Sequence, residues 1–126
     1  TPPTSQQAVF GNPRTEAAFF SSFRPVDHLF SGASPFGVFN MAGSVWEWVQ
    51  DSYNPEYYSS TPGATPNLAR RGNRVLRGGS WTSPATELHT YNRHQLEPVI
   101  SQESLHDLVY WDVGFRCAMD AEQRDT

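Results

Sequence analysis

The chain has 126 residues, enough for one domain or a part of one, and it carries a formal net charge of −4. Nucleic-acid-binding proteins present a basic patch to the phosphates, and the densest basic stretch here, Arg70 to Arg77, is read as a solvated turn among Pro, Asn and Gly. We therefore expect no nucleic-acid partner. No apolar run approaches the roughly 20 residues that a membrane-spanning helix needs, so no membrane span is expected either.

The first third of the chain shows little regular pattern. Residues 1–7 have neither the basic start nor the apolar stretch of a signal peptide, and we expect irregular structure over residues 1–15. Residues 16–20 favour one helical turn, and residues 24–36 favour a loop.

Three short strands are predicted beyond that point. Residues 45–49 alternate, which places Trp46 and Trp48 on one face, where we expect both to be core residues. Residues 74–77 run into a Gly-Gly pair that allows close backbone approach, and residues 113–117 form the third strand.

The intervening stretches, 50–73 and 82–109, show little regular signal apart from a short helix predicted at 101–108. Irregular segments of that length are usually functional, or are held by ions and neighbouring segments.

Three blocks occur in a fixed order along the chain. They are residues 36–49, which include Asn40-Met41-Ala42-Gly43-Ser44-Val45-Trp46-Glu47-Trp48, then residues 74–81, which include Arg77-Gly78-Gly79-Ser80, and finally Gly114-Phe115-Arg116-Cys117-Ala118. Together they resemble the second half of the formylglycine-generating enzyme (sulfatase-modifying factor) family. Ser44 is a departure from the family pattern, in which asparagine is commoner.

The resemblance implies an α+β fold that is irregular, loop-rich and related to C-type lectins, with short strands. Residues 30–119 would be the C-terminal part of that domain, residues 1–29 a linker or the remnant of its N-terminal half, and residues 120–126 a tail. A sheet lacking its partner strands presents open edges, which folded proteins avoid. We therefore expect an incomplete domain, and a partner polypeptide or larger complex in an extracytoplasmic compartment.

The block around Gly43 predicts a Ca²⁺ site. A hard cation takes six to eight oxygen ligands, and backbone carbonyls at a tight turn supply some of them. The family holds calcium at this block, which implies the side-chain oxygens of Asn40 and Glu47 with the carbonyls of Gly43 and Val45 as ligands. The alternative is that Asn40 caps the turn and Glu47 pairs with a buried arginine such as Arg116.

The chain lacks the cysteine pair that formylglycine generation requires. In the resembled family two thiolates hold copper, and their expected places here are Ser83 and Leu88. Neither side chain can bind soft Cu(I), so no copper and no formylglycine-generating activity are expected, and no catalytic residue is assigned. The single cysteine, Cys117, would be buried and free, or paired with another polypeptide.

Three functions remain open. The first is a non-catalytic structural or binding subunit of a larger assembly. The second is the C-terminal part of an oxygen-using enzyme of the ergothioneine-type sulfoxide synthase kind, whose metal ligands lie in another domain. The third is a lectin-like ligand-binding domain that uses the 82–112 loops.

The histidines do not indicate a catalytic metal. His89 and His94 are five residues apart, which is not the spacing that places two ligands on one helical face, and His28 and His106 are isolated. A serine, histidine and aspartate triad could be written from Ser80, His94 and Asp112, but no nucleophile-elbow sequence supports it.

Overall fold

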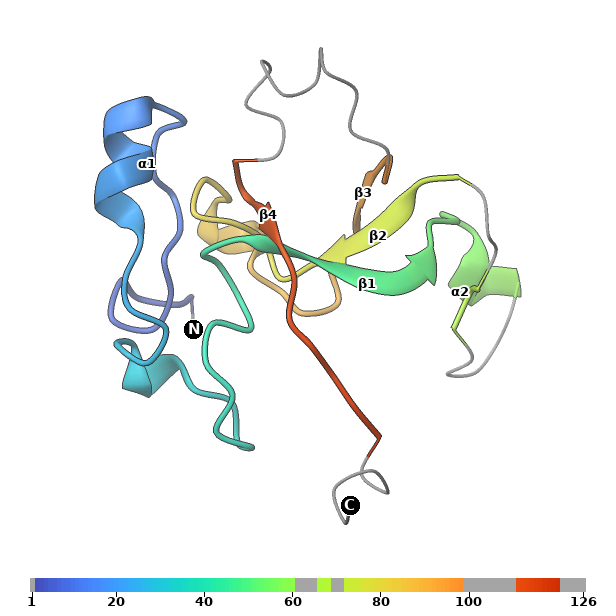
Figure 1. Cartoon of the computed structure of the whole chain (residues 1–126), viewed down its shortest axis with the longest axis horizontal. Coiled ribbons are helices and arrows are strands. Elements are labelled where there is room, and N and C mark those ends of the chain that lie inside the picture. The colour runs from blue at the N-terminus through green and yellow to red at the C-terminus, as the bar shows by residue number, and fades with distance from the viewer. Residues whose placement is uncertain (1, 61–65, 69–71, 99–110, 121–126) are drawn as a thin grey trace.

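The computed structural model describes residues 2–60, 66–68, 72–98 and 111–120. A 4-stranded sheet of order β3-β2-β1-β4 lies at its centre, with α1 beyond one end of the sheet and α2 beyond the other (Figure 1). The strands are β1 (Trp46–Ser52), β2 (Arg74–Arg77), β3 (His94–Leu96) and β4 (Val113–Gly114). The helices are α1 (Glu16–Ser22) and α2 (Tyr57–Ser60), with 3₁₀ turns η1 (Phe30–Gly32) and η2 (Ala85–Glu87).

The sheet is mixed. β2 pairs antiparallel with β1 and with β3, whereas β4 pairs parallel with β1 through Trp46 opposite Val113 and Glu47 opposite Gly114. β2 has the predicted bounds, and β1 begins one residue later than predicted and continues to Ser52.

Two strand expectations need correction. The strand predicted over residues 113–117 ends at Gly114, because Phe115 turns out to solvent and Arg116 turns to the Glu47 carboxylate. β3 was not predicted. Its three residues are too short for a periodic signal, and its conformation is fixed by pairing with β2, in which His94 lies opposite Leu76.

The predicted helical turn at residues 16–20 is confirmed and extends to Ser22 as α1. Thr15 begins it, because its side-chain oxygen accepts a hydrogen bond from Ala18 N at 3.2 Å, which satisfies one of the free amides of the first turn. The helix predicted at 101–108 lies outside the described residues, and among those that are described no helix is long and apolar enough to cross a membrane.

The core is aromatic and lies between α1 and the turn that follows β2. Trp81 is fully buried and packs with Val9 and Leu29, while Phe19 and Phe23 contact its ring edge-on or tilted at centroid distances of 5.9 and 6.1 Å. Trp46 and Trp48, which were expected in the core, are only half-buried. That expectation is wrong, because Trp81 is the tryptophan at the centre of the core.

Residues before 30 take part in this core. Val9 and Leu29 are buried, and Phe19 on α1 packs against them. These contacts tie the first 29 residues to the sheet, and the domain boundaries drawn from the sequence remain a prediction.

Candidate functional site

Three segments, residues 9–12, 43–46 and 78–83, are joined by backbone hydrogen bonds. Ser44 N donates to Val9 O at 2.8 Å and Gly43 N to Gly78 O at 2.8 Å, while Ser44 O accepts from Trp81 N at 2.7 Å. Asn12 N and Asn12 Nδ2 both donate to Trp81 O at 3.0 Å. The first two sequence blocks therefore meet in space, with the N-terminal segment beside them.

The loop over residues 40–44 winds through the left-handed region three times. Asn40, Gly43 and Ser44 have φ values of 56°, 75° and 64°. A Cβ on Gly43 would lie 2.4 Å from Val9 O, so both the conformation and the space require glycine. At Ser44 the left-handed backbone favours asparagine, which explains physically why asparagine is the commoner residue in the resembled pattern.

Arg116 holds this loop to the end of the sheet through four hydrogen bonds made by one guanidinium. Its Nε donates to Glu47 Oε2 at 2.6 Å and its Nη2 to Glu47 Oε1 at 2.5 Å. Its Nη1 donates to Phe39 O and its Nη2 to Asn40 O, both at 3.1 Å, and Nη2 is shared between two of these acceptors.

The Glu47–Arg116 pair that the sequence suggested as an alternative is thus present, although the Arg116 side chain is 36% exposed and not buried. The hydrogen bonds to Glu47, aided by its charge, raise the pKa of Arg116 above the ordinary value against the opposing effect of partial burial.

Three of the four predicted calcium ligands line one surface cavity, and Gly43 is not part of its lining. A cavity of about 410 Å³ is lined by Asn40, Val45 and Glu47 together with Arg116 and four other residues, Val26, Phe39, Ser44 and Phe115. Asn40 Nδ2 donates to Val26 O at 3.0 Å, which orients the side-chain amide. Oxygen donors from a tight turn and one carboxylate suit a hard cation, so the donor set fits Ca²⁺. The one carboxylate in this donor set, Glu47, is already hydrogen-bonded to the guanidinium of Arg116.

The positions expected for the cysteine pair converge on one glycine. A Cβ built on Gly79 would lie 2.7 Å from Leu88 Cδ2 and 3.5 Å from both Ser83 Cβ and Ser83 Oγ. Ser83 and Leu88 are 6% and 7% exposed, and Ser83 Oγ accepts from Ser80 N at 3.0 Å. The fold thus brings the two side chains to one buried place, which holds a hydroxyl and an isobutyl group.

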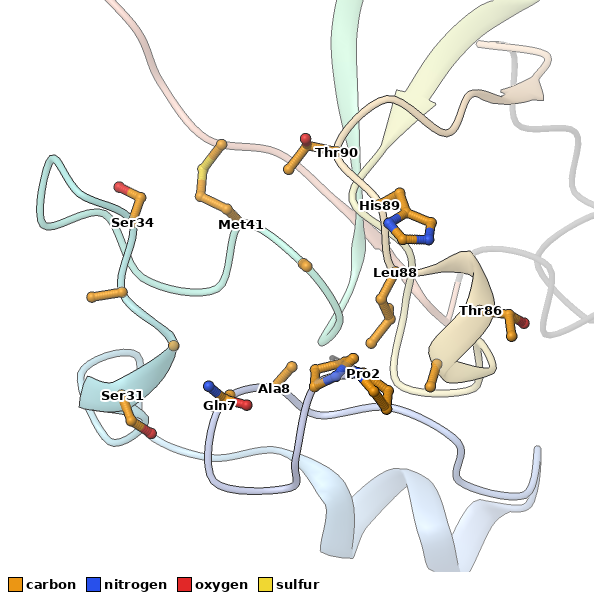
Figure 2. Close-up of a pocket in the computed structure, with 15 residues that line it drawn as sticks. Pro2, Gln7, Ala8, Ser31, Ser34, Met41, Thr86, Leu88, His89 and Thr90 are labelled. Atoms are coloured by element: carbon orange, nitrogen blue, oxygen red, sulfur yellow. The ribbon is translucent and has the colours of Figure 1, made fainter.

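A second, larger cleft opens beside Leu88. It has a volume of about 680 Å³ and is lined by residues 2, 3, 7, 8, 31–34, 41, 42, 85, 86 and 88–90. Ser31 and Ser34 lie on one side of it, and Thr86, Leu88 and His89 lie on the other (Figure 2). None of these side chains carries a fixed charge.

Ser80 and Asp112, two members of the triad considered from the sequence, are in contact. Ser80 Oγ donates to Asp112 Oδ2 at 3.0 Å, and the same oxygen accepts from Arg14 Nη1 at 3.1 Å. Both Ser80 and Asp112 are buried, while the ring of the third member, His94, lies tilted against Trp46 at a centroid distance of 5.3 Å. This arrangement is a structural network, because Ser80 donates directly to the acid.

The other sequence expectations can now be placed. Arg77 bridges loops, donating to the carbonyls of Thr90 and Tyr91 and to Tyr58 Oη. Cys117 is exposed because the chain beyond Gly114 runs along the surface, so the first alternative, a buried free thiol, is wrong, while pairing with another polypeptide stays a prediction. In the described part of the chain no three His, Cys, Asp or Glu side chains gather into a metal-binding cluster.

The sequence missed the roles of Trp81, Arg14 and Arg93. Arg93 lies over the rings of Tyr58 and Tyr53 at 4.6 and 5.5 Å and donates to Asn54 O at 3.0 Å, which anchors the segment around α2. Each of these contacts spans tens of residues, and no local pattern marks it.

The model of the sulfatase-modifying factor enzyme 1-like domain matches residues 3–121. The chain belongs to this family. This confirms the resemblance read from the sequence.

Relatives of different activity share the domain. The chain is 35% identical over 113 residues to the serine/threonine-protein kinase Pkn1 of Chlamydia trachomatis, covering 86% of this chain and 17% of the relative. It is 34% identical over 102 residues to the formylglycine-generating enzyme of Streptomyces coelicolor, covering 80% and 28%. It is 34% identical over 106 residues to the hercynine oxygenase of Mycolicibacterium thermoresistibile, covering 75% and 23%.

A solved structure supports the fold. The structure of PvdO from Pseudomonas aeruginosa superposes with a TM-score of 0.54 at 23% identity, covering 75% of this chain and 35% of that chain. The fold is therefore that of this family, with few helices and a curled sheet of four strands. The chain spans less than a third of the length of each of the three curated relatives described above.

Proposed function

We propose that this chain is a non-catalytic domain of the family that serves as a structural or binding part of a larger protein. The observation that carries the proposal is the pair Ser83 and Leu88, which meet at Gly79 where the resembled enzymes would place two thiolates. The chain has one cysteine, Cys117, which is exposed on the segment after β4, so it offers no second sulfur for a copper site.

The cleft beside Leu88 is the place where such a domain would bind its partner. Its lining is uncharged and mixes small apolar side chains with hydroxyl, amide and imidazole groups, which suits a neutral segment or ligand. The short length relative to the curated proteins supports a role within a larger protein, and the proposed compartment is extracytoplasmic. A relationship of the fold to C-type lectins belongs to this proposal as well.

The test restores the missing pair. Peptides with a sulfatase-type cysteine motif, incubated with the intact protein, copper and oxygen, should show no aldehyde by mass spectrometry. The double variant Ser83→Cys, Leu88→Cys should bind Cu(I) in competition with a chelating dye, while each single variant should not. Aldehyde formed by the unaltered protein above a no-protein control would overturn the proposal.

An oxygen-using enzyme is the second candidate, favoured by the 34% identity to a hercynine oxygenase. In that case the iron ligands would come from another part of the full-length protein. Purified full-length protein should then contain iron and form a sulfoxide from a histidine betaine and a thiol with oxygen. Iron-free protein that makes no such product would eliminate this candidate.

Calcium is proposed to bind at Asn40, Gly43, Val45 and Glu47. An ion that binds the folded state alone stabilises it by RT ln(1 + [L]/Kd), about 2.7 kcal/mol when free calcium is a hundredfold above Kd. Chelation of the intact protein should lower its Tm and calcium should restore it, while Glu47→Ala should abolish the response. A Tm unmoved by chelator, with no metal by elemental analysis, would leave the Glu47–Arg116 pair as the whole account of this loop.

A further inference from the structure

In the proposed cation site, the positive charge of Arg116 is already paired with the Glu47 carboxylate. Its guanidinium donates to both oxygens of Glu47, the one carboxylate among the proposed ligands, at 2.6 and 2.5 Å. It also donates to the carbonyls of Phe39 and Asn40, so the loop that would surround an ion is already held without one. The cavity beside these groups is lined by Glu47 and Arg116 together.

A divalent ion on Glu47 would therefore meet a resident positive charge. Two cations that share one carboxylate lie roughly 5 Å apart, and even at the dielectric constant of water their repulsion lowers the affinity of a divalent ion on the order of tenfold. Arg116 cannot lose its proton to relieve this, because guanidinium stays charged throughout the physiological pH range and the contact with Glu47 raises its pKa further.

We propose that Arg116 sets the cation affinity of this site by competing with Ca²⁺ for the Glu47 carboxylate. The inference rests on the proposed calcium site and adds the residue that regulates it. When the ion binds, Arg116 gives up part of its contact with Glu47, and the segment after β4 loosens from the carbonyls of residues 39 and 40. The coupling is reciprocal. The factor by which the Arg116–Glu47 contact weakens calcium binding is also the factor by which bound calcium weakens that contact.

The test separates the charge of Arg116 from its shape. Arg116→Gln removes the charge, whereas Arg116→Lys keeps it and loses the planar fork, so both variants lose the two-point contact with Glu47. Chelator-treated intact protein is titrated with CaCl₂ in a calorimeter, after near-UV circular dichroism has shown that each variant is folded. Arg116→Gln should bind calcium about tenfold more tightly than the unaltered protein. Arg116→Lys should stay within about threefold of it, and Arg24→Gln, at an exposed arginine that does not line the cavity, should not differ.

The outcomes distinguish the two proposals. Equal affinities of the unaltered protein and Arg116→Gln would overturn the competition and leave the calcium site standing. Calcium binding seen in Arg116→Gln alone would support it, since the charge then excludes the ion completely. Absence of calcium binding in every folded variant would remove the calcium site itself, and the competition with it.

A second measurement avoids dependence on a variant that fails to fold. The Nε–H signal of Arg116 in the unaltered protein, assigned through its correlations to the other side-chain nuclei of Arg116, can be followed by NMR while CaCl₂ is added. Competition predicts that this signal moves as calcium binds, because its acceptor Glu47 Oε2 is lost. Calcium binding that leaves the signal in place would overturn the inference.

Discussion

The turn over residues 78–83 and the loop over residues 36–40 both adjoin segment 43–46, but they are held by different means. The turn is fixed by backbone hydrogen bonds to Gly43, Ser44 and Asn12, and its Ser80 and Trp81 are fully buried. The loop is exposed, with Phe36 at 93%, and depends on the guanidinium of Arg116.

The buried turn and the exposed loop are therefore two different kinds of site beside one small sheet. At the turn, Ser80, Trp81 and Ser83 are buried and Ser80 N donates to Ser83 Oγ, while Leu88 is buried at the edge of the larger cleft. At the loop, a carboxylate, carbonyls and a cation face a cavity that solvent enters. A bound ligand can change the stability of the loop. The stability of the turn depends instead on which residues the sequence places there.

The largest effect is expected for Trp81→Ala, which should lower the free energy of unfolding by about 3–5 kcal/mol. The loss reflects the cavity left among Val9, Leu29 and Phe19. Trp81→Phe should cost much less, because Trp81 Nε1 is buried without a hydrogen-bond partner among the described residues and that penalty disappears. Phe115→Ala, at a side chain 75% exposed, should change stability by less than about 0.5 kcal/mol. The free energies of unfolding of all three variants are measured in urea. Similar losses of stability for Trp81→Ala and Phe115→Ala would contradict the difference between the buried turn and the exposed surface.

Gly43→Ala should destabilise by more than about 2 kcal/mol, because a left-handed Cβ costs about 1 kcal/mol and here it also meets Val9 O at 2.4 Å. Gly37 is the matched control. Its φ of 76° imposes the same conformational penalty, but nothing lies within 4 Å of its Cβ position, so Gly37→Ala should cost about 1 kcal/mol. Thermal unfolding measures both, and equal losses would show that the junction at Val9 is not tight.

Ser80→Ala should cost about 1–3 kcal/mol, because it leaves the buried Asp112 carboxylate without its serine donor. Glu47→Gln, which removes a partly exposed ion pair in calcium-free buffer, should cost about 1 kcal/mol or less. Added salt should reduce the Glu47 effect and leave the Ser80 effect unchanged. A Glu47→Gln loss that exceeds the Ser80→Ala loss would mean that the loop, not the turn, is the more tightly fixed region.

The smallest effect has the opposite sign. Ser44→Asn should raise the free energy of unfolding by a few tenths of a kcal/mol, roughly 0.3–0.8, because asparagine tolerates the left-handed backbone at φ 64° better than serine does. Ser34→Asn is a control at a residue outside the positive-φ region, and no gain is expected there. A loss at Ser44 would show that the added amide collides with the neighbouring segments.

The sequence predicted what depends on neighbouring residues. β2 was predicted with its observed bounds, α1 and β1 were predicted nearly so, and the Glu47–Arg116 pair was one of two alternatives read from the residues. The family followed from three short blocks, because close backbone approach at Gly43 and Gly79 admits few other residues.

Tertiary structure decided what depends on distant partners. β3 exists through its pairing with β2, and Trp81 became the core tryptophan because α1 and Val9 close over it. The joint contact of Ser80 and Arg14 with Asp112, and the end of β4 at Gly114, were likewise set by partners far away in the chain. Local sequence carries the periodicity and the turn conformations, whereas burial and charge pairing arise only when segments tens of residues apart meet.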